Sequence, residues 1–142
     1  MTEPPIPEGF EPQPRRSPLT DPWEPIYWKQ TPDAIILGLW LAKPHTNARG
    51  FVHGGLIAAL TDKAMGHSCG HQLRHVSSLV TVSMSIDFIS SAQIGQWLTV
   101  ETEVIKTGRT ICFAQCFVKA DGATIARANG TFRVVKKEPP KE

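Results

Sequence analysis

The chain has 142 residues, 41% of them hydrophobic and 20% charged, and these values fit one globular domain with a hydrophobic core. Its net charge of +2 arises from scattered acidic and basic residues, which excludes the clustered basic surface of a nucleic-acid-binding protein. No apolar run approaches the ~20 residues that span a bilayer, and the proline-rich amino terminus does not resemble a signal peptide, so we expect a cytoplasmic protein without membrane insertion.

The first 25 residues contain eight prolines, too many for regular hydrogen-bonded structure, so we predict an arm or a disordered lead there. Residues 26–136 are expected to form the folded domain, and residues 137–142 a charged tail. Within the domain, a short extended piece at 26–29 and an apolar run at 34–41 flank a proline-containing turn. These two pieces are expected to pair as a hairpin.

The one long helix that the sequence predicts covers Leu56 to Met65, where apolar residues recur at the spacing of a single helical face. An irregular polar loop at 43–50 precedes it, and the pair Gly54-Gly55 lies where the helix begins. We expect Gly70 to interrupt the helical segment.

The second half of the chain is expected to form four antiparallel, meandering strands, at 80–88, 98–105, 111–118 and 124–135. In the first strand apolar and polar residues alternate, the period of a sheet with one covered face. The apolar residues expected against the helix are Val80, Val82, Met84, Ile86 and Phe88. Asp121-Gly122 before the last strand favours a type I′ hairpin, because both central residues of that turn take positive φ. The fold class is therefore α+β, with one helix wrapped by one curved sheet.

Gly54, Gly55 and Asp62 form the candidate site that the residues themselves indicate. Glycines at a helix start permit close backbone approach, and the free N–H groups there can stabilise a carbonyl oxygen that gains negative charge. Asp62 shares its predicted helical face with small apolar residues, where a carboxylate without a function would be costly. Gly55 and Asp62 lie ~10 Å apart along a helix, too far to contact one carbonyl carbon, so we infer that a second copy supplies one half.

The candidate site belongs to a longer string of residues: Asn47, Gly50, His53-Gly54-Gly55 and Asp62. This string, on a loop that enters a helix, resembles the signature of the hotdog-fold thioesterases of the phenylacetate-degradation type. That group includes thioesterase superfamily member 2 and one branch of the 4-hydroxybenzoyl-CoA thioesterases. The resemblance implies a hotdog fold and hydrolysis of acyl-CoA thioesters, with coenzyme A as part of the substrate and no separate cofactor or metal.

The resemblance also implies roles for individual residues. The Gly55 N–H polarises the thioester carbonyl, while Asp62 of the facing subunit acts as nucleophile or as general base on water. Asn47 orients the carbonyl or the water, His53 helps to fix the loop, and the Thr81 hydroxyl assists the carboxylate.

Coenzyme A is expected to bind along a subunit interface. The residues that the resemblance suggests for substrate and CoA contacts are His53, Gly54, Val82, Ser83, Gly108 and Arg109. Arg109 is a candidate phosphate contact, although a solvated arginine in a turn is the simpler explanation. Family members assemble as dimers of dimers, so we expect a homotetramer.

Two other motifs are weaker candidates. The segment 66–70 matches the G-x-S-x-G pattern of serine hydrolases around Ser68, but that motif links a strand to a following helix, whereas this segment ends a helix. His67, His71 and His75 are spaced for one face of a continuous helix, but the expected break at Gly70 argues against a metal site. The odd number of cysteines, without a second pair for zinc, indicates reduced and mostly buried thiols: Cys69, Cys112 and Cys116.

Alternatives stay open at this point. Asp62 could be a structural carboxylate satisfied by Lys63 or by a partner helix, and His53 could simply cap the helix or pack the loop. The chain could also be a hotdog hydratase or dehydratase, or a subunit that binds acyl-CoA without turnover. The acyl group is not predicted, because residues suited to its pocket are equally ordinary core residues: Trp40, Phe51, Met65 and Phe88.

Overall fold

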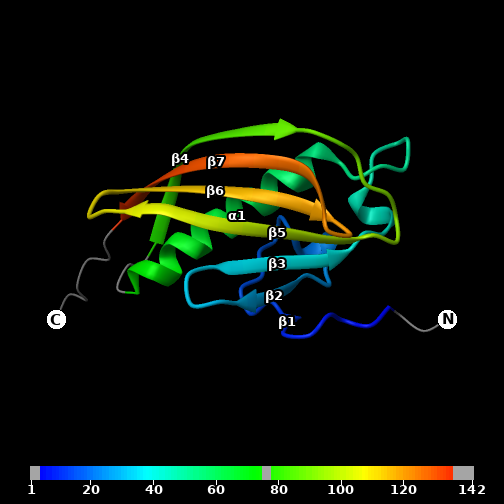
Figure 1. Cartoon of the computed structure of the whole chain (residues 1–142), viewed down its shortest axis with the longest axis horizontal. Coiled ribbons are helices and arrows are strands. Elements are labelled where there is room, and N and C mark those ends of the chain that lie inside the picture. Colours follow the sequence, from blue (N-terminus) through cyan, green and yellow to red (C-terminus); the bar gives the residue numbers. More distant parts are fainter. Residues whose placement is uncertain (1–3, 75–77, 136–142) are drawn as a thin grey trace.

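The computed structural model describes residues 4–74 and 78–135, in which one long helix lies against one antiparallel sheet (Figure 1). The helices are α1 (Gly54–Leu73) and two short 3-10 helices, η1 (Asp21–Trp23) and η2 (Lys43–His45). The strands are β1 (Glu11–Pro12), β2 (Tyr27–Gln30), β3 (Ile35–Trp40), β4 (Ser78–Phe88), β5 (Trp97–Thr107), β6 (Ile111–Ala120) and β7 (Ala123–Val135). The predicted α+β class is confirmed. Within the described residues, no helix combines the length and apolar character needed to cross a bilayer.

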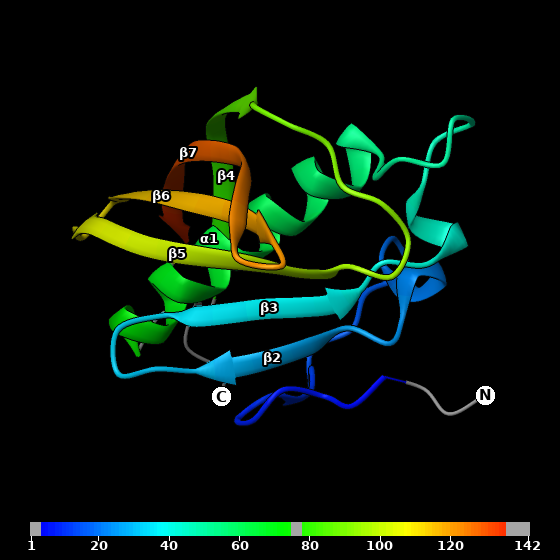
Figure 2. The same ribbon diagram turned by 45° about the vertical axis from the view of Figure 1, so that its right-hand side comes forward.

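The sheet curves around α1 in the strand order β1-β2-β3-β5-β6-β7-β4 (Figure 2). The two predicted hairpins are confirmed: β2 pairs with β3, and β6 joins β7 through Asp121 and Gly122, whose φ angles are 48° and 85°. The expectation that all four later strands meander is wrong for β4, which pairs with β7 at the edge of the sheet. Both sides of β5 are taken, by β3 and β6, so β4 cannot lie beside it.

Helix α1 begins at the paired glycines but extends well past its predicted end at Met65. The expectation that Gly70 interrupts the helix is therefore wrong. Tertiary contacts hold the last turns: Ser68 is fully buried and bonded to the backbone of β3, and the His71 ring bonds to the Thr31 carbonyl at 3.1 Å. Such packing outweighs the ~1 kcal/mol that a glycine costs in a helix.

Strand β4 departs from simple alternation because a β-bulge interrupts its pairing with β7 between Thr81 and Ser83. The extra residue reverses which side chains face the helix. Before the bulge Thr81 faces α1, and after it Met84 and Ile86 pack against the core. The prediction of the covered face is therefore wrong for Val80 and Val82, which are more than half exposed. Phe88 lies on the predicted side, with its ring beside Gly54 at the start of α1, but at the edge of the sheet more than half of it is exposed.

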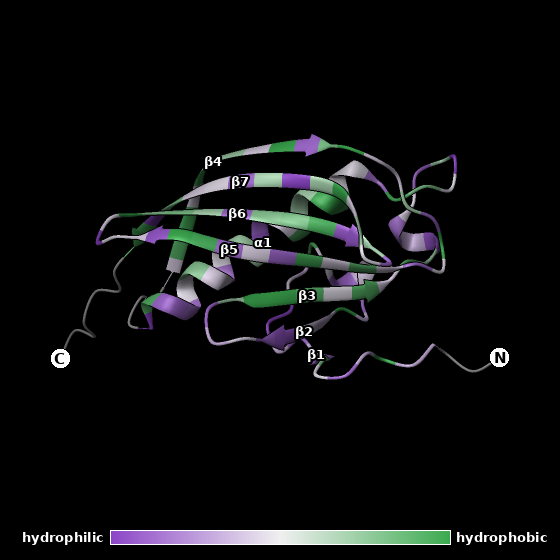
Figure 3. Cartoon of the chain, viewed as in Figure 1, coloured by the Kyte–Doolittle hydropathy of each residue, from purple (hydrophilic) through white to green (hydrophobic). Residues whose placement is uncertain are grey.

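The hydrophobic core fills the space between α1 and the concave face of the sheet. Leu56, Leu60 and Met65 of α1 are at most 2% exposed, and they pack with strand residues such as Leu98 and Phe132. Figure 3 shows that β3 is apolar along most of its length, and four of its six residues are buried. This core fixes α1 rigidly across the sheet.

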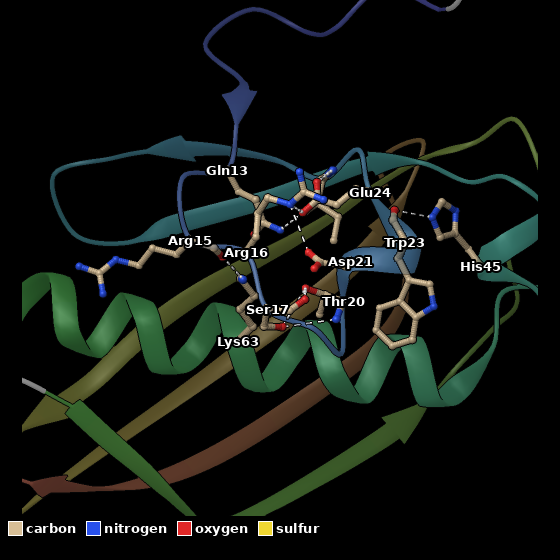
Figure 4. A network of polar contacts seen from close by, with 11 residues as sticks. Gln13, Arg15, Arg16, Ser17, Thr20, Asp21, Trp23, Glu24, His45 and Lys63 are labelled. Carbon is tan, nitrogen blue, oxygen red and sulfur yellow. Dashed lines mark hydrogen bonds and ion pairs between the residues drawn. The ribbon is translucent and has the colours of Figure 1, made fainter.

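The described part of the proline-rich arm, residues 4–25, packs along the domain (Figure 4). The prediction that it lacks hydrogen-bonded structure is wrong, since β1 pairs with β2 and η1 forms a turn. Prolines are tolerated there because they fall on an edge strand and at the start of a helix. Polar side chains brace the arm internally, with Gln13 bonded to Glu24 and Arg16 paired with Asp21.

Candidate active site

Asp62 extends from the middle of α1 toward β4, where its carboxylate meets Thr81. The Thr81 Oγ1 donates a hydrogen bond to Asp62 Oδ1 at 2.5 Å, a length typical of a hydroxyl bonded to a charged carboxylate. The bulge in β4 allows this contact, because uninterrupted alternation would turn Thr81 away from the helix. Two of the residues predicted for the site are therefore in direct contact.

Asp62 and Thr81 line a pocket of about 440 Å³ between α1, the start of β4 and the hairpin of β2 and β3. This volume lies within the ~300–1,000 Å³ that is usual for small-molecule sites. Ile35, Leu79 and Phe132 contribute apolar side chains to its wall. The pocket thus combines one carboxylate and its hydroxyl donor with a surface that suits a substrate with an apolar part.

Asp62 has no ion-pair partner in the part of the chain that the structure describes. Lys63, the neighbour that could have neutralised it, instead donates from Nζ to the backbone carbonyl of Arg15 (Figure 4). The explanation of Asp62 as a carboxylate paired with Lys63 is therefore wrong. Its oxygens remain available to accept a proton or to attack a carbonyl carbon.

The start of α1 offers backbone donors, but one of them is already occupied. His53 is the N-cap residue, and its Nδ1 accepts a hydrogen bond from the Gly55 N–H at 2.7 Å. The Gly54 N–H has no acceptor among the described residues, and it lies at the positive end of the helix dipole. The role predicted for Gly55 would require the His53 ring to turn away, whereas Gly54 is free to donate as it stands.

Asn47 shapes the loop that leads into α1. Its Oδ1 accepts hydrogen bonds from the N–H groups of Arg49 at 2.9 Å and Phe51 at 3.2 Å. Its amide nitrogen has no hydrogen bond to any residue that the structure describes. The nitrogen, and not the oxygen, is therefore the atom of Asn47 that can orient a substrate carbonyl.

These groups form two clusters that one chain keeps apart. Gly54 and Asp62 are on one continuous helix, eight residues or ~12 Å apart along its axis. Neither Gly54 nor Asn47 lines the pocket that contains Asp62 and Thr81. Within a single copy, a substrate carbonyl cannot touch both the carboxylate and the free backbone donor.

The remaining residues predicted to contact CoA lie outside the Asp62 pocket. Arg109 is exposed in the turn between β5 and β6. An added Cβ at Gly108 would lie 2.9 Å from the Ile111 carbonyl oxygen, which explains this glycine by packing alone. Val82 and Ser83 are exposed on β4, at the bulge and just after it.

The two competing motifs do not form sites in the described residues. Ser68 is fully buried within α1, so the G-x-S-x-G pattern presents no exposed nucleophile. His67 and His71 lie on α1, His75 falls outside the described residues, and the described part of the chain holds no cluster of three metal-ligating side chains.

The three cysteines are free and buried, as predicted. Burial raises the pKa of Cys69 and that of Cys116 to about 12. Such thiols carry almost no thiolate at neutral pH, so neither of them can act as the nucleophile of a hydrolase.

His67 and Arg15 are among the pocket residues that were not predicted as site residues. His67 follows Asp62 by five positions, and its pKa is lowered to about 4, first by burial and then by the positive charges of Lys63 and Arg15. Its imidazole is therefore neutral at pH 7. The spacing of four from Lys63 on a helix could have indicated His67, but nothing local to the arm indicates that Arg15 reaches the pocket.

Comparisons with known proteins identify the family of the chain. The thioesterase superfamily matches residues 49–126, a range that contains both Asp62 and Thr81. A Pseudomonas aeruginosa protein named esterase PA0474 is 33% identical over 130 residues, which are 91% of this chain and 97% of that protein. Human acyl-coenzyme A thioesterase 13 is 33% identical over 104 residues, 70% of this chain and 72% of that protein.

A solved structure extends the likeness to three dimensions. Zebra fish thioesterase superfamily member 2 superposes with a TM-score of 0.72 and 26% identity, over 78% of this chain and 81% of that one. The resemblance to hotdog-fold thioesterases and the predicted hotdog fold are therefore confirmed.

Proposed function

We propose that this chain, which belongs to the thioesterase superfamily, hydrolyses acyl-CoA thioesters with Asp62 as its catalytic carboxylate. Membership of the family supports thioester hydrolysis in general. The acyl-CoA class of substrate is supported by the name of the human relative, acyl-coenzyme A thioesterase 13. The observation that carries the assignment of Asp62 is its 2.5 Å bond from Thr81 on the wall of the pocket.

The chemistry follows from the groups in contact with the pocket. Asp62 takes a proton from water as the water oxygen attacks the thioester carbon, or its own oxygen attacks that carbon first. In the first route the carbon–sulfur bond then breaks, the proton held by Asp62 passes to the departing sulfur, and the acyl group leaves as a carboxylic acid that ionises. In the second route CoA leaves first, the acyl group stays on Asp62 as an anhydride, and water hydrolyses the anhydride to release the acyl carboxylate, with one water proton going to the thiolate. Thr81 holds one Asp62 oxygen, which orients the other toward the substrate.

The carbonyl oxygen needs donors as it gains negative charge. The Gly54 N–H at the start of α1 and the amide nitrogen of Asn47 in the loop before it are suited to this role. Both are donors without an acceptor in the described residues. Since these donors are ~12 Å from Asp62 along α1, we propose that they come from a second copy of the chain.

A two-fold axis between two copies would bring Asp62 of each copy to the helix start of the other. Along β4, Thr81 lies beside Asp62, and an added Cβ at Gly54 would lie 3.3 Å from the Phe88 ring, so β4 runs antiparallel to the first half of α1. A two-fold axis that passes near Ala58, midway between Gly54 and Asp62, would therefore pair each carboxylate with the helix start of the other copy. Ala58 is small and half-buried, which permits a close approach of the two helices.

The free edge of β4 supplies a surface for such a dimer. β4 is the last strand of the described sheet, so its outer backbone groups are unpaired, and it exposes Val80, Val82 and Phe88 by more than half. Pairing of β4 with β4 of a second copy would satisfy those groups and cover the apolar side chains. The dimer of dimers, the absence of a separate cofactor and the cytoplasmic location stay predictions from the sequence.

The test is thiol release from a panel of short, medium, long and aromatic CoA esters by purified wild-type protein and Asp62→Asn. The amide keeps the shape of the side chain but cannot accept a proton or attack, so substrate should bind while turnover falls ~10³-fold or more. Calorimetry of Asp62→Asn with an intact CoA ester that the wild type hydrolyses checks that substrate binding is kept. Retention of most of the turnover in Asp62→Asn would refute the assignment, and CoA-ester binding without thiol release by the wild type would favour a non-catalytic subunit.

A further inference from the structure

The Asp62 pocket contains two cations, and the carboxylates of Glu24 and Asp21 attract one of them, Lys63, from beyond ion-pair distance. Arg15 enters it from the arm and Lys63 from α1. Neither side chain forms an ion pair with any carboxylate in the described residues. The recorded bond of Lys63 is to a neutral acceptor, the Arg15 backbone carbonyl (Figure 4). Two cations against one carboxylate, Asp62, leave the pocket with a net charge of +1.

The position of Arg15 is held by the contacts around it. On one side, Gln13 is 5% exposed and donates to Glu24 at 2.6 Å. On the other side, Arg16 pairs with Asp21 and Glu24 at 3.2 and 3.6 Å. Figure 4 shows the Arg15 side chain leaving this braced segment and extending along α1, away from the network. The arm therefore places the Arg15 guanidinium in the pocket, and the contacts of the neighbouring residues fix the Arg15 backbone.

The two cations also affect the protonation of His67 in the same pocket. His67, which also lines it, has its pKa lowered by burial and then by Lys63 and Arg15, so it contributes no positive charge at neutral pH. The positive charge of the pocket thus comes from two fixed cations close to the reacting carboxylate. A neutral acyl chain would leave the Arg15 guanidinium without a paired carboxylate, and Lys63 with only the longer-range attraction of Glu24 and Asp21.

We propose that Arg15 and Lys63 form an anion-binding subsite for a carboxylate at the far end of the acyl group, so that the preferred substrates are CoA thioesters of dicarboxylic acids. This inference rests on the proposed function. The apolar side chains of Ile35, Leu79 and Phe132 would contact the methylene groups between the two ends. We place the cations on the acyl side, because they share the pocket with Asp62 and these apolar side chains, whereas the pantetheine arm of CoA keeps the phosphates far from the thioester.

The test compares kcat/KM for glutaryl-CoA and hexanoyl-CoA, which have similar length but differ in terminal charge. Wild type is expected to prefer glutaryl-CoA, and Arg15→Met to lower kcat/KM for glutaryl-CoA by ~10- to 100-fold, the effect of one lost hydrogen bond to a charged group. Hexanoyl-CoA turnover should stay unchanged. Lys63→Met should show the same selectivity, and Arg15→Lys should retain part of the preference.

Lys106→Met is the control, because it removes one positive charge from an exposed position of β5 that neither lines the pocket nor braces the arm. It should leave the ratio of the two substrates at the wild-type value. Thermal unfolding of each variant separates a folding defect from a loss of recognition. Calorimetric affinities of both esters in the Asp62→Asn background give the same comparison without turnover.

Several outcomes would overturn the subsite. One is an equal ratio of the two esters in wild type and Arg15→Met. Another is an equal fall of kcat/KM for both CoA esters in Arg15→Met. If that fall is absent with the corresponding pantetheine thioesters, the cations bind the phosphates of CoA and not the acyl group. If wild type hydrolyses hexanoyl-CoA but the ratio of kcat/KM for the two esters is the same in wild type and Arg15→Met, the subsite is wrong and the thioesterase function stands. If wild type hydrolyses neither ester, nor any other in the CoA panel, the function itself is wrong, and the calorimetric ratio still decides the subsite.

Discussion

The bond from Thr81 to Asp62 can be removed with almost no change of shape by the substitution Thr81→Val. Valine replaces the hydroxyl with a methyl group and keeps the branched side chain that suits a strand. A buried hydrogen bond to a charged group contributes ~1.5–3 kcal/mol, and solvent exposure of this pair lowers the expected contribution to about 1–2 kcal/mol. If that energy orients Asp62 in the transition state, kcat should fall ~5- to 30-fold.

The assay is steady-state thiol release with the best CoA ester of the panel, with kcat and KM measured separately. KM should change little, because Thr81 orients the carboxylate and is not expected to bind the substrate itself. Thr81→Ser is the matched control, since it restores the hydroxyl and should recover most of the activity. Thermal unfolding should show similar stability for all three proteins, because Thr81 is exposed.

Two results would refute this reasoning. Full activity in Thr81→Val would mean that the bond to Asp62 has no role in turnover. A loss of activity that Thr81→Ser does not recover would mean that the packing of the threonine methyl group, and not its hydroxyl, supports the site.

Three further predictions concern other parts of the site. Asn47→Asp keeps the oxygen that closes the loop but removes the free amide donor, so kcat should fall ~10²- to 10³-fold while the melting temperature stays close to wild type. His67 binds a proton below about pH 4 when folded but below about 6.5 when unfolded, so its contribution to stability is complete above pH 6.5 and is lost as pH falls toward 4. Between pH 7 and 4, the free energy of unfolding from urea titrations should therefore fall ~1–2 kcal/mol less for His67→Gln than for wild type. An equal fall in the two proteins would contradict this. Ser85→Cys, on the exposed edge strand near the proposed two-fold axis, should form an intersubunit disulfide under mild oxidation, whereas Arg109→Cys, in a distant turn, should not.

The sequence predicts the architecture well where the signals are local. The paired glycines locate the start of α1, the Asp121-Gly122 turn locates the last hairpin, and strand periodicity locates every strand of the second half. The order of the strands is not local, because it depends on which edge of β5 is already occupied. Likewise, the length of α1 depends on tertiary contacts of Ser68 and His71 that no helical propensity contains.

The candidate site shows the same division. Strict alternation along β4 turns Thr81 away from the helix, while the family resemblance makes it a partner of Asp62, and the bulge explains why the resemblance was the better guide to this contact. The occupied N–H of Gly55 follows from the rotamer of His53, which sequence spacing does not determine. Arg15 was not predicted because its arrival at the pocket depends on the path of the whole arm.

The most direct test of the two-copy site is complementation in mixed dimers. Asp62→Asn and Asn47→Asp chains, carrying different affinity tags, are co-expressed, and the dimers that contain one chain of each kind are purified through both tags. In such a dimer one site receives Asp62 and Asn47 from the two intact halves, so its thiol release should reach about half that of wild type, although each parent is nearly inactive. Mixed dimers as inactive as their parents would contradict the account, because the carboxylate and the donors would then have to act within one chain.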